Sequence, residues 1–164
     1  MREPERGVAH ASSAEAMRAL GARLATALQA RPAGTSILIT LAGDLGAGKT
    51  TLVGGVLEAL GYAGHVRSPT YTLIEPYRLA GGDFYHCDLY RLRHPDELED
   101  LGLLELRGVV GGVLLVEWPE RACGRLGTTD LAIDIRYSGA GRTVEWEAGT
   151  PAGQVLAAGL SGQT

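Results

Sequence analysis

Eight residues in the first half of the chain, from Gly43 to Thr50, have the types and spacing of a phosphate-binding loop. They are Gly-Asp-Leu-Gly-Ala-Gly-Lys-Thr and match the pattern G-x-x-x-x-G-K-[ST] of the P-loop. Glycines let the backbone curl so that successive N–H groups point at phosphate oxygens, and a following helix adds its positive end. In such a loop the lysine, here Lys49, contacts the β- and γ-phosphates, and the Thr50 hydroxyl ligates Mg²⁺.

The composition of the chain supports this interpretation of Lys49. It is the only lysine among 15 basic residues, and every other one is an arginine. A compact ammonium fits a cradle of backbone groups, whereas a planar guanidinium does not. The sequence therefore predicts a phosphate site here, in preference to a glycine-rich turn that happens to contain a lysine.

Two acids follow apolar segments and are candidates for metal binding and catalysis. Glu117 comes directly after four apolar residues, 113–116, and Asp88 lies within His-Cys-Asp-Leu-Tyr-Arg at 86–91. A nucleotide site needs such acids to hold Mg²⁺, directly or through water, and to orient the attacking group. The structural alternatives are an acid that merely ends a strand for Glu117 and an ion pair with Arg91 for Asp88. We favour the functional interpretation for both acids because the P-loop is present.

Three further residues have weaker signals. Thr70, in Ser-Pro-Thr at 68–70, stands where nucleotide switches often place a hydroxyl, but the same tripeptide fits a plain turn. Trp118 could contact a nucleotide or fill the core equally well. We interpret His86 as a hydrogen-bonded histidine within the sheet and not as a base.

The P-loop requires a strand before it and a helix after it, and the sequence predicts both. Residues 37–41 are apolar and β-branched, and residues 51–60 have apolar residues at helical spacing. The other expected elements are a helix within 12–30, strands at 71–78 and 84–90, an acidic helix at 94–106, strands at 112–116, 131–137 and 143–147, and a short helix after Thr150. This order predicts an α/β fold with a P-loop NTPase-like mixed, largely parallel sheet, flanked by helices in a single domain.

Length and charge limit the possible functions. We expect one domain at 12–160, a loose lead-in at 1–11 and a frayed tail at 161–164. A net charge of −4 provides no general attraction to nucleic acid. The two cysteines form no C-x-x-C pair, no apolar run approaches the roughly 18 residues of a membrane span, and the charged N-terminus does not fit a signal peptide. We therefore expect a cytoplasmic protein with no membrane partner.

Four motifs occur in one order: Gly-Asp-Leu-Gly-Ala-Gly-Lys-Thr-Thr at 43–51, Ser-Pro-Thr-Tyr-Thr-Leu at 68–73, His-x-Asp-x-Tyr-Arg at 86–91 and Val-Glu-Trp-Pro-Glu at 116–120. Together they resemble the TsaE (formerly YjeE) family, the small P-loop ATPase of bacterial tRNA threonylcarbamoyladenosine synthesis. The resemblance covers roughly residues 12–148. It implies ATP hydrolysis with Mg²⁺, carried out together with the threonylcarbamoyl-transferase subunit and the paralogous partner of that subunit. Contact with tRNA would be indirect, through the complex.

The resemblance also implies roles for individual residues. Lys49, Asp88 and Glu117 would be catalytic, and Thr50, Asp88 and Glu117 would serve Mg²⁺. The nucleotide would contact Gly43, Asp44, Gly46, Ala47, Gly48, Lys49, Thr50, Thr51, Thr70, Trp118 and Arg142. Met17 stands where the family often has a threonine near the base, so the base contacts of this chain are not predicted.

Two other functions share the P-loop and stay open at this point. A small-molecule or nucleotide kinase would need an acceptor pocket and usually a lid, and no long insertion is present. A nucleotide-dependent binding module would bind ATP without turnover. A switch GTPase is excluded more firmly, because guanine recognition typically uses Asn-Lys-x-Asp and the only lysine lies in the P-loop.

Overall fold

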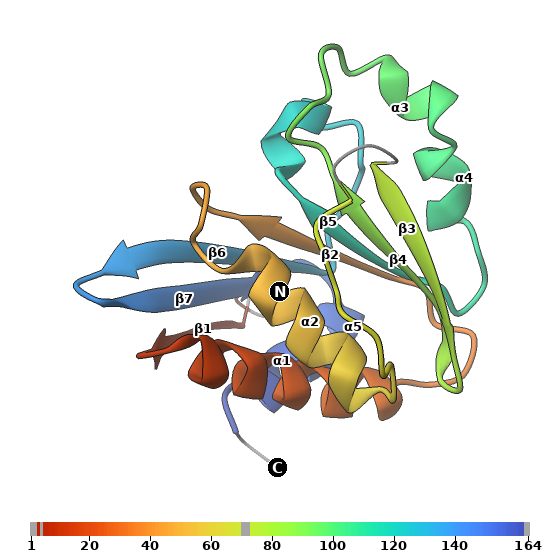
Figure 1. Ribbon diagram of the computed structural model, residues 1–164. Coiled ribbons are helices and arrows are strands. Elements are labelled where there is room, and N and C mark those ends of the chain that lie inside the picture. The colour runs from red at the N-terminus through yellow and green to blue at the C-terminus, as the bar shows by residue number, and fades with distance from the viewer. Residues whose placement is uncertain (1–2, 4, 70–72, 163–164) are drawn as a thin grey trace.

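The computed structural model describes residues 3, 5–69 and 73–162 of the chain (Figure 1). Its strands are β1 (Arg6–Ala11), β2 (Ile37–Ala42), β3 (Ile74–Leu79), β4 (Gly82–Asp88), β5 (Val113–Glu117), β6 (Leu131–Ser138) and β7 (Gly141–Ala148). Its α-helices are α1 (Ala14–Gln29), α2 (Lys49–Ala59), α3 (Glu97–Asp100), α4 (Leu103–Arg107) and α5 (Pro151–Leu160), and a 3₁₀ turn, η1, spans Pro119–Ala122. None of the helices in these ranges is long and apolar enough to cross a membrane.

All the described strands belong to one mixed sheet with the order β1-β7-β6-β2-β5-β4-β3. The four strands in its centre, β6, β2, β5 and β4, are parallel to one another, and the outer strands β7, β1 and β3 pair antiparallel. The expected α/β fold with a mixed sheet and a parallel centre is confirmed. Parallel strands end at the same edge of a sheet, so this order brings the ends of β2, β4 and β5 together.

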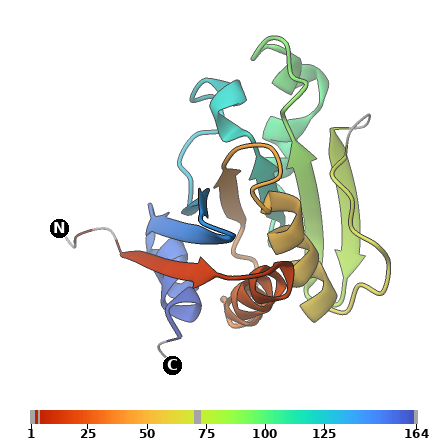
Figure 2. The ribbon, with the colours of Figure 1, turned by 60° about the vertical axis from the view of Figure 1, so that its left-hand side comes forward.

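Helices cover both faces of the central strands (Figures 1 and 2). Helices α1, α2 and α5 bury one apolar cluster against one face, and α3, α4 and the segment around η1 bury a second cluster against the other. Strand β2 shows the division, because Ile37, Ile39 and Leu41 belong to the first cluster and Leu38 to the second. A strand covered on both faces needs apolar residues at consecutive positions, which explains the uninterrupted apolar sequence of β2 and β5.

Two glycines set how closely α1 and α2 pack. A β-carbon on Gly21 of α1 would lie 2.4 Å from the carbonyl oxygen of Leu52, and one on Gly55 of α2 would lie 2.3 Å from that of Arg18. The two helices therefore approach backbone to backbone, which places the first turn of α2 and the P-loop that precedes it.

Three sequence expectations need correction. The loose lead-in expected at 1–11 is wrong for residues 6–11, which form β1 and pair antiparallel with β7 along its free edge. The single helix expected at 94–106 is two short helices, because Gly102 adopts a left-handed conformation (φ 69°) between them. Strand β4 ends at Asp88 and not at residue 90. The expected start of the preceding strand falls at 71–72 and part of the expected tail at 163–164, which lie outside the described residues.

Candidate functional site

The segment between β2 and α2 has the backbone that a phosphate cradle requires. Gly43, Gly46 and Gly48 have φ values of 148°, 75° and 113°, a region that residues with a β-carbon rarely adopt. At Gly43 a β-carbon would also lie 2.5 Å from the carbonyl oxygen of Ile135 in β6. Gly48 is the N-cap of α2 and has no side chain to cap the first N–H groups of that helix. These N–H groups remain available to an anion.

Lys49, the first residue of α2, is 5% exposed. Its ammonium donates to the carbonyl oxygens of Gly43 and, at 3.0 Å, of Asp44. Its Nζ also lies 4.2 Å from the centre of the Trp118 ring, within the range of a cation–π contact. Burial lowers the pKa of Lys49 from its ordinary value, and the nearby carboxylate of Glu117 acts in the opposite direction. The only lysine of the chain is thus held at the P-loop by weak acceptors that an anion could replace.

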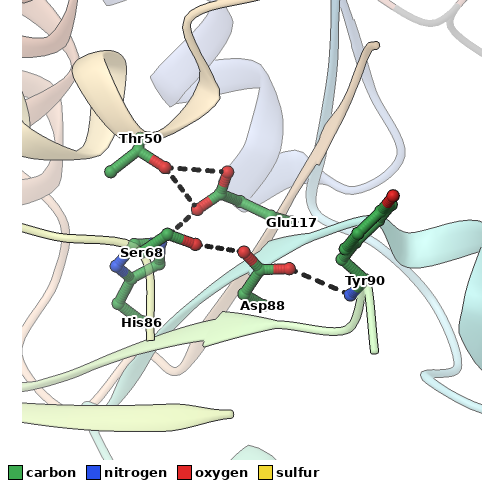
Figure 3. A network of polar contacts seen from close by, with 6 residues as sticks. All are labelled: Thr50, Ser68, His86, Asp88, Tyr90 and Glu117. Carbon is green, nitrogen blue, oxygen red and sulfur yellow. Dashed lines mark hydrogen bonds and ion pairs between the residues drawn. The ribbon is translucent and has the colours of Figure 1, made fainter. Parts of the chain in front are cut away.

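Glu117, the last residue of β5, faces the P-loop and is 2% exposed. The hydroxyl of Thr50 lies 3.1 and 3.0 Å from its two carboxylate oxygens and donates to them (Figure 3). Asp88 ends the neighbouring parallel strand β4 and stands directly beside Glu117 in the register of the sheet. The fold therefore brings together a hydroxyl and two carboxylates that lie 38 and 29 positions apart in the sequence.

The Asp88 side chain has two hydrogen-bond partners, one in the segment between α2 and β3 and one just after β4. One carboxylate oxygen accepts from the hydroxyl of Ser68, and the other accepts from the backbone N–H of Tyr90 at 2.9 Å (Figure 3). The backbone N–H of Asp88 in turn donates to the carbonyl oxygen of Leu73, a residue with a positive φ of 59°. Thr70, the switch-like residue of the sequence analysis, lies outside the described residues.

His86 is a second contact of Glu117 that the sequence analysis did not connect with the site. It is fully buried in β4, and its Nε2 lies 2.5 Å from the Glu117 carboxylate. The expected hydrogen-bonded histidine is present, and its partner is the candidate catalytic acid. A signal existed, because residues two apart on a strand point to the same face and His86 precedes Asp88 by two.

Most of the expected site residues line one hollow of about 220 Å³, and Gly43, Asp44 and Arg142 are not among them. Residues 45–51 of the P-loop and α2 form one side of it, and Ser68, Asp88, Glu117 and Trp118 form the other. Trp118 follows β5 in a left-handed conformation (φ 58°), and its ring centre lies 4.9 Å from that of Tyr90. The fold therefore places Lys49, Thr50 and both acids around a single space.

The hairpin of β6 and β7 also contacts the P-loop, through two of its side chains. Arg142 of β7 donates to the carbonyl oxygens of Ala47 at 3.0 Å and Gly46 at 3.2 Å, while its guanidinium lies 4.1 Å from the centre of the Tyr137 ring. The hydroxyl of Tyr137 donates to the carbonyl oxygen of Leu45 at 2.8 Å. Arg142 was expected at the site, whereas Tyr137 was missed because nothing in its local sequence distinguishes it from other strand residues.

A second hollow, of about 260 Å³, adjoins the P-loop on the side of α1. Met17, Arg142 and the loop residues 46–48 are among those that line it. Met17 is 2% exposed, and its side chain lies next to Gly48, where a β-carbon would come within 3.2 Å of the Met17 Cε. A larger hollow of about 770 Å³ lies across β1, β7 and β6, and no P-loop residue lines it. The candidate site is therefore identified by the residues that line it and not by the volume of the hollow.

Comparison with known proteins gives the same family as the motifs. The sequence model of the family described as "Threonylcarbamoyl adenosine biosynthesis protein TsaE" matches residues 11–145. The tRNA threonylcarbamoyladenosine biosynthesis protein TsaE of Haemophilus influenzae is 43% identical over 126 residues, which are 77% of this chain and 79% of that protein. The protein of the same name in Bacillus subtilis is 46% identical over 103 residues, 62% of this chain and 63% of that one.

A solved structure is similar over nearly the whole fold. The crystal structure of Bacillus subtilis YdiB superposes with a TM-score of 0.74 at 28% sequence identity, and the match covers 98% of this chain and 97% of that one.

Proposed function

The chain belongs to the TsaE family of tRNA threonylcarbamoyladenosine biosynthesis proteins, and we propose that in this pathway it binds ATP with Mg²⁺ and hydrolyses it. One observation carries the proposal. A hydroxyl and two carboxylates, from Thr50, Asp88 and Glu117, converge beside the lysine of a P-loop. Binding alone would need only the loop and its lysine, whereas phosphoryl transfer also needs acids placed at the phosphate.

The P-loop binds the phosphates of ATP. Its backbone N–H groups and those of the first turn of α2 donate to phosphate oxygens. Lys49 exchanges the carbonyl oxygens of Gly43 and Asp44 for the charged phosphate, a stronger acceptor. The ring of Trp118, whose centre lies 4.2 Å from Nζ, adds a cation–π contact to the ammonium.

The donor set fits Mg²⁺, a hard cation that prefers oxygen ligands. Thr50, Asp88 and Glu117 would hold it, directly or through water, with phosphate oxygens as further ligands. Within the described residues no cluster of three His, Cys, Asp or Glu side chains forms a metal cage, which agrees with a cation bound jointly with the nucleotide. When bound, Mg²⁺ supplies positive charge at the phosphoryl group being transferred.

Hydrolysis then requires an oriented water molecule, and Glu117 is placed to orient it. The oxygen of water forms a bond to the γ-phosphorus, the bond from that phosphorus to the bridging oxygen breaks, and ADP and phosphate leave. Both protons of the water leave on the phosphate, which departs as dihydrogen phosphate. The Glu117 carboxylate is hydrogen-bonded to Thr50 and is almost fully buried. We therefore expect it to accept a hydrogen bond from one water molecule in a fixed direction.

The proposal includes partners. We expect the protein to act with the threonylcarbamoyl-transferase subunit and the paralogous partner of that subunit, and to reach tRNA only through their complex. The net charge of −4 supports indirect contact, because a phosphate backbone is bound mainly through basic side chains.

Phosphate release tests the proposal. The purified protein should release phosphate from ATP with Mg²⁺ and stop when the cation is chelated. Glu117→Gln and Asp88→Asn should bind ATP to a similar extent and lose most of the turnover, because each keeps the shape of the side chain and removes its charge. Arg78→Gln, an exposed change in the outer strand β3, is the matched control and should leave turnover unchanged.

The alternatives give different results in the same assay. Binding without phosphate release, alone and with the transferase pair, would identify a nucleotide-dependent binding module. Transfer of the γ-phosphate to a small-molecule acceptor would identify a kinase. Turnover at the wild-type rate in both acid variants would show that these acids are structural.

A further inference from the structure

His86 has an unusual position among the polar residues of the chain. It is fully buried in the middle of the sheet, next to strand β5, and among the described residues only one of its two ring nitrogens has a hydrogen-bond partner. Nε2 lies 2.5 Å from the Glu117 carboxylate, while Nδ1 is buried without a hydrogen-bond partner among the described residues. A buried polar atom without a partner is costly, so a histidine kept there for packing alone is poorly explained.

The direction of the contact depends on the tautomer of His86. Because an ionised carboxylate can only accept hydrogen bonds, we expect Nε2 to carry the ring proton and to be the donor. Nδ1 has no hydrogen-bond partner among the described residues. In Figure 3 the contact with His86 leaves the Glu117 carboxylate toward the lower left, and the contacts with Thr50 leave it toward the upper left.

Thr50 and His86 both contact the Glu117 carboxylate, but only Thr50 also lines the nucleotide site. Within the described part of the chain the carboxylate has two hydrogen-bond partners, Thr50 and His86. Thr50 is the residue proposed for Mg²⁺, and its hydroxyl faces the nucleotide site. His86 is fully buried and is not among the residues that line the hollow. We therefore expect its hydrogen bond to Glu117 to be kept when nucleotide and Mg²⁺ bind.

We propose that His86 is a positioning residue for the ATP hydrolysis proposed above: its Nε2–H fixes the Glu117 carboxylate in the orientation that directs water and Mg²⁺. Glutamate has three side-chain torsions, and a carboxylate free to rotate would seldom be aligned with the γ-phosphate. Partners that hold a ligand or a catalytic group from behind commonly change activity by about 10–100-fold when they are removed.

Two amides provide a matched test. The side-chain nitrogen of glutamine can occupy the place of histidine Nε2, whereas that of asparagine reaches only the place of Nδ1. His86→Asn should lower kcat for ATP by about tenfold or more and change KM by less than about twofold, and His86→Gln should restore most of kcat. His94→Asn is the control, because His94 is 65% exposed and outside the site. An unchanged kcat in His86→Asn, or a His86→Gln variant no better than His86→Asn, would overturn the proposal.

A double variant tests whether His86 acts through Glu117. In a Glu117→Gln background, His86→Asn should cause no further loss of the residual turnover. A second loss as large as that in the wild-type background would give His86 a separate role and overturn the proposal.

A measurement without nucleotide tests the contact of His86 with Glu117 independently of ATP hydrolysis. It needs no His86 variant, so it remains possible if those variants fail to fold. In ¹⁵N-labelled protein the ring of His86 should carry its proton on Nε2, and Glu117→Gln should shift that signal while the His94 signal stays in place. A proton on Nδ1, or a His86 signal indifferent to Glu117→Gln, would overturn the contact itself. Wild-type protein that releases no phosphate, alone or with the transferase pair, would overturn the hydrolysis and the positioning role with it.

Discussion

The chemistry of single residues explains why this chain keeps a lysine at position 49. The Lys49 ammonium lies between the carbonyl oxygens of the P-loop and the face of Trp118, with carboxylates nearby. A guanidinium is planar and presents its donors in a rigid fork, whereas an ammonium is a compact charge on a flexible stem. The fold thus gives a physical reason for the one position that differs from the arginine used elsewhere.

Replacement of Lys49 by alanine should abolish ATP binding and preserve the fold. The loss of a charge-assisted contact to phosphate should cost about 1.5–3 kcal/mol or more. Calorimetric titration with ATP measures the first effect, and thermal unfolding of the free protein measures the second. Unchanged ATP affinity would contradict the phosphate site, and a protein that no longer unfolds cooperatively would mean that Lys49 serves the core.

The two tryptophans allow a direct observation of the site. Trp118 lies at the hollow beside Lys49, whereas Trp146 of β7 is 4% exposed and packs against Gly7 in the core. In a Trp146→Phe background the remaining emission should therefore change when Mg²⁺-ATP or Mg²⁺-ADP is added. The matched Trp118→Phe protein should show little change. Equal responses of the two proteins would contradict the position of Trp118 at the site.

At the scale of elements, the packing of α1 on α2 determines where the P-loop stands. Gly55→Ala should destabilise the protein by about 1–3 kcal/mol, because the new methyl group would meet the backbone of α1 at Arg18. Gly54→Ala is the matched control, since its β-carbon would come no closer than 3.9 Å to Val66. On propensity alone it should be neutral or stabilising by up to about 1 kcal/mol. Urea unfolding measures the free energy of unfolding of both variants. Equal values would contradict the close approach of α1 and α2 at Gly55.

The elements around the P-loop were predictable because their signals are local. An apolar strand, a glycine loop and a helix follow one another directly, and the closing hairpin and the helix capped by Thr150 also have contiguous patterns. The P-loop, Asp88 and Glu117 could be identified for the same reason, as each belongs to a short motif. Their roles in catalysis stay predictions.

Most of the features that were missed depend on distant partners. Strand β1 is an edge strand whose short sequence is only partly apolar, and its pairing partner, β7, lies about 130 residues away. Tyr137 supports the loop at Leu45 through a contact that spans 92 positions. Gly102 interrupts a helical pattern by a local conformation that a glycine allows but does not require. The contacts of β1 and Tyr137 are set by the assembled sheet and leave no periodic signal in the sequence.

For the whole molecule, size and charge limit what it can do alone. The single sheet and its helices use most of the chain, and the acidic total charge gives a tRNA backbone little to bind. We expect slow ATP hydrolysis and weak tRNA binding by the isolated protein. Turnover should rise when the transferase pair is present and completes the site beside Ser68.

Steady-state phosphate release, alone and with the pair, with and without tRNA, measures this effect. Fast turnover by the isolated protein, or a stimulation by tRNA that does not require the pair, would contradict the expectation.

The strand order has a consequence for the growing chain on the ribosome. The neighbours of β2 are β5 and β6, which begin at Val113 and Leu131, so β2 has no partner strand until two thirds of the chain has been made. A nascent chain that stops before Val113 contains the complete P-loop motif but lacks the sheet that holds it. Long-range pairing of this kind is slow to form. Prematurely ended chains should therefore not capture nucleotide in the cell, and the proposed ATP binding should arise only late in synthesis.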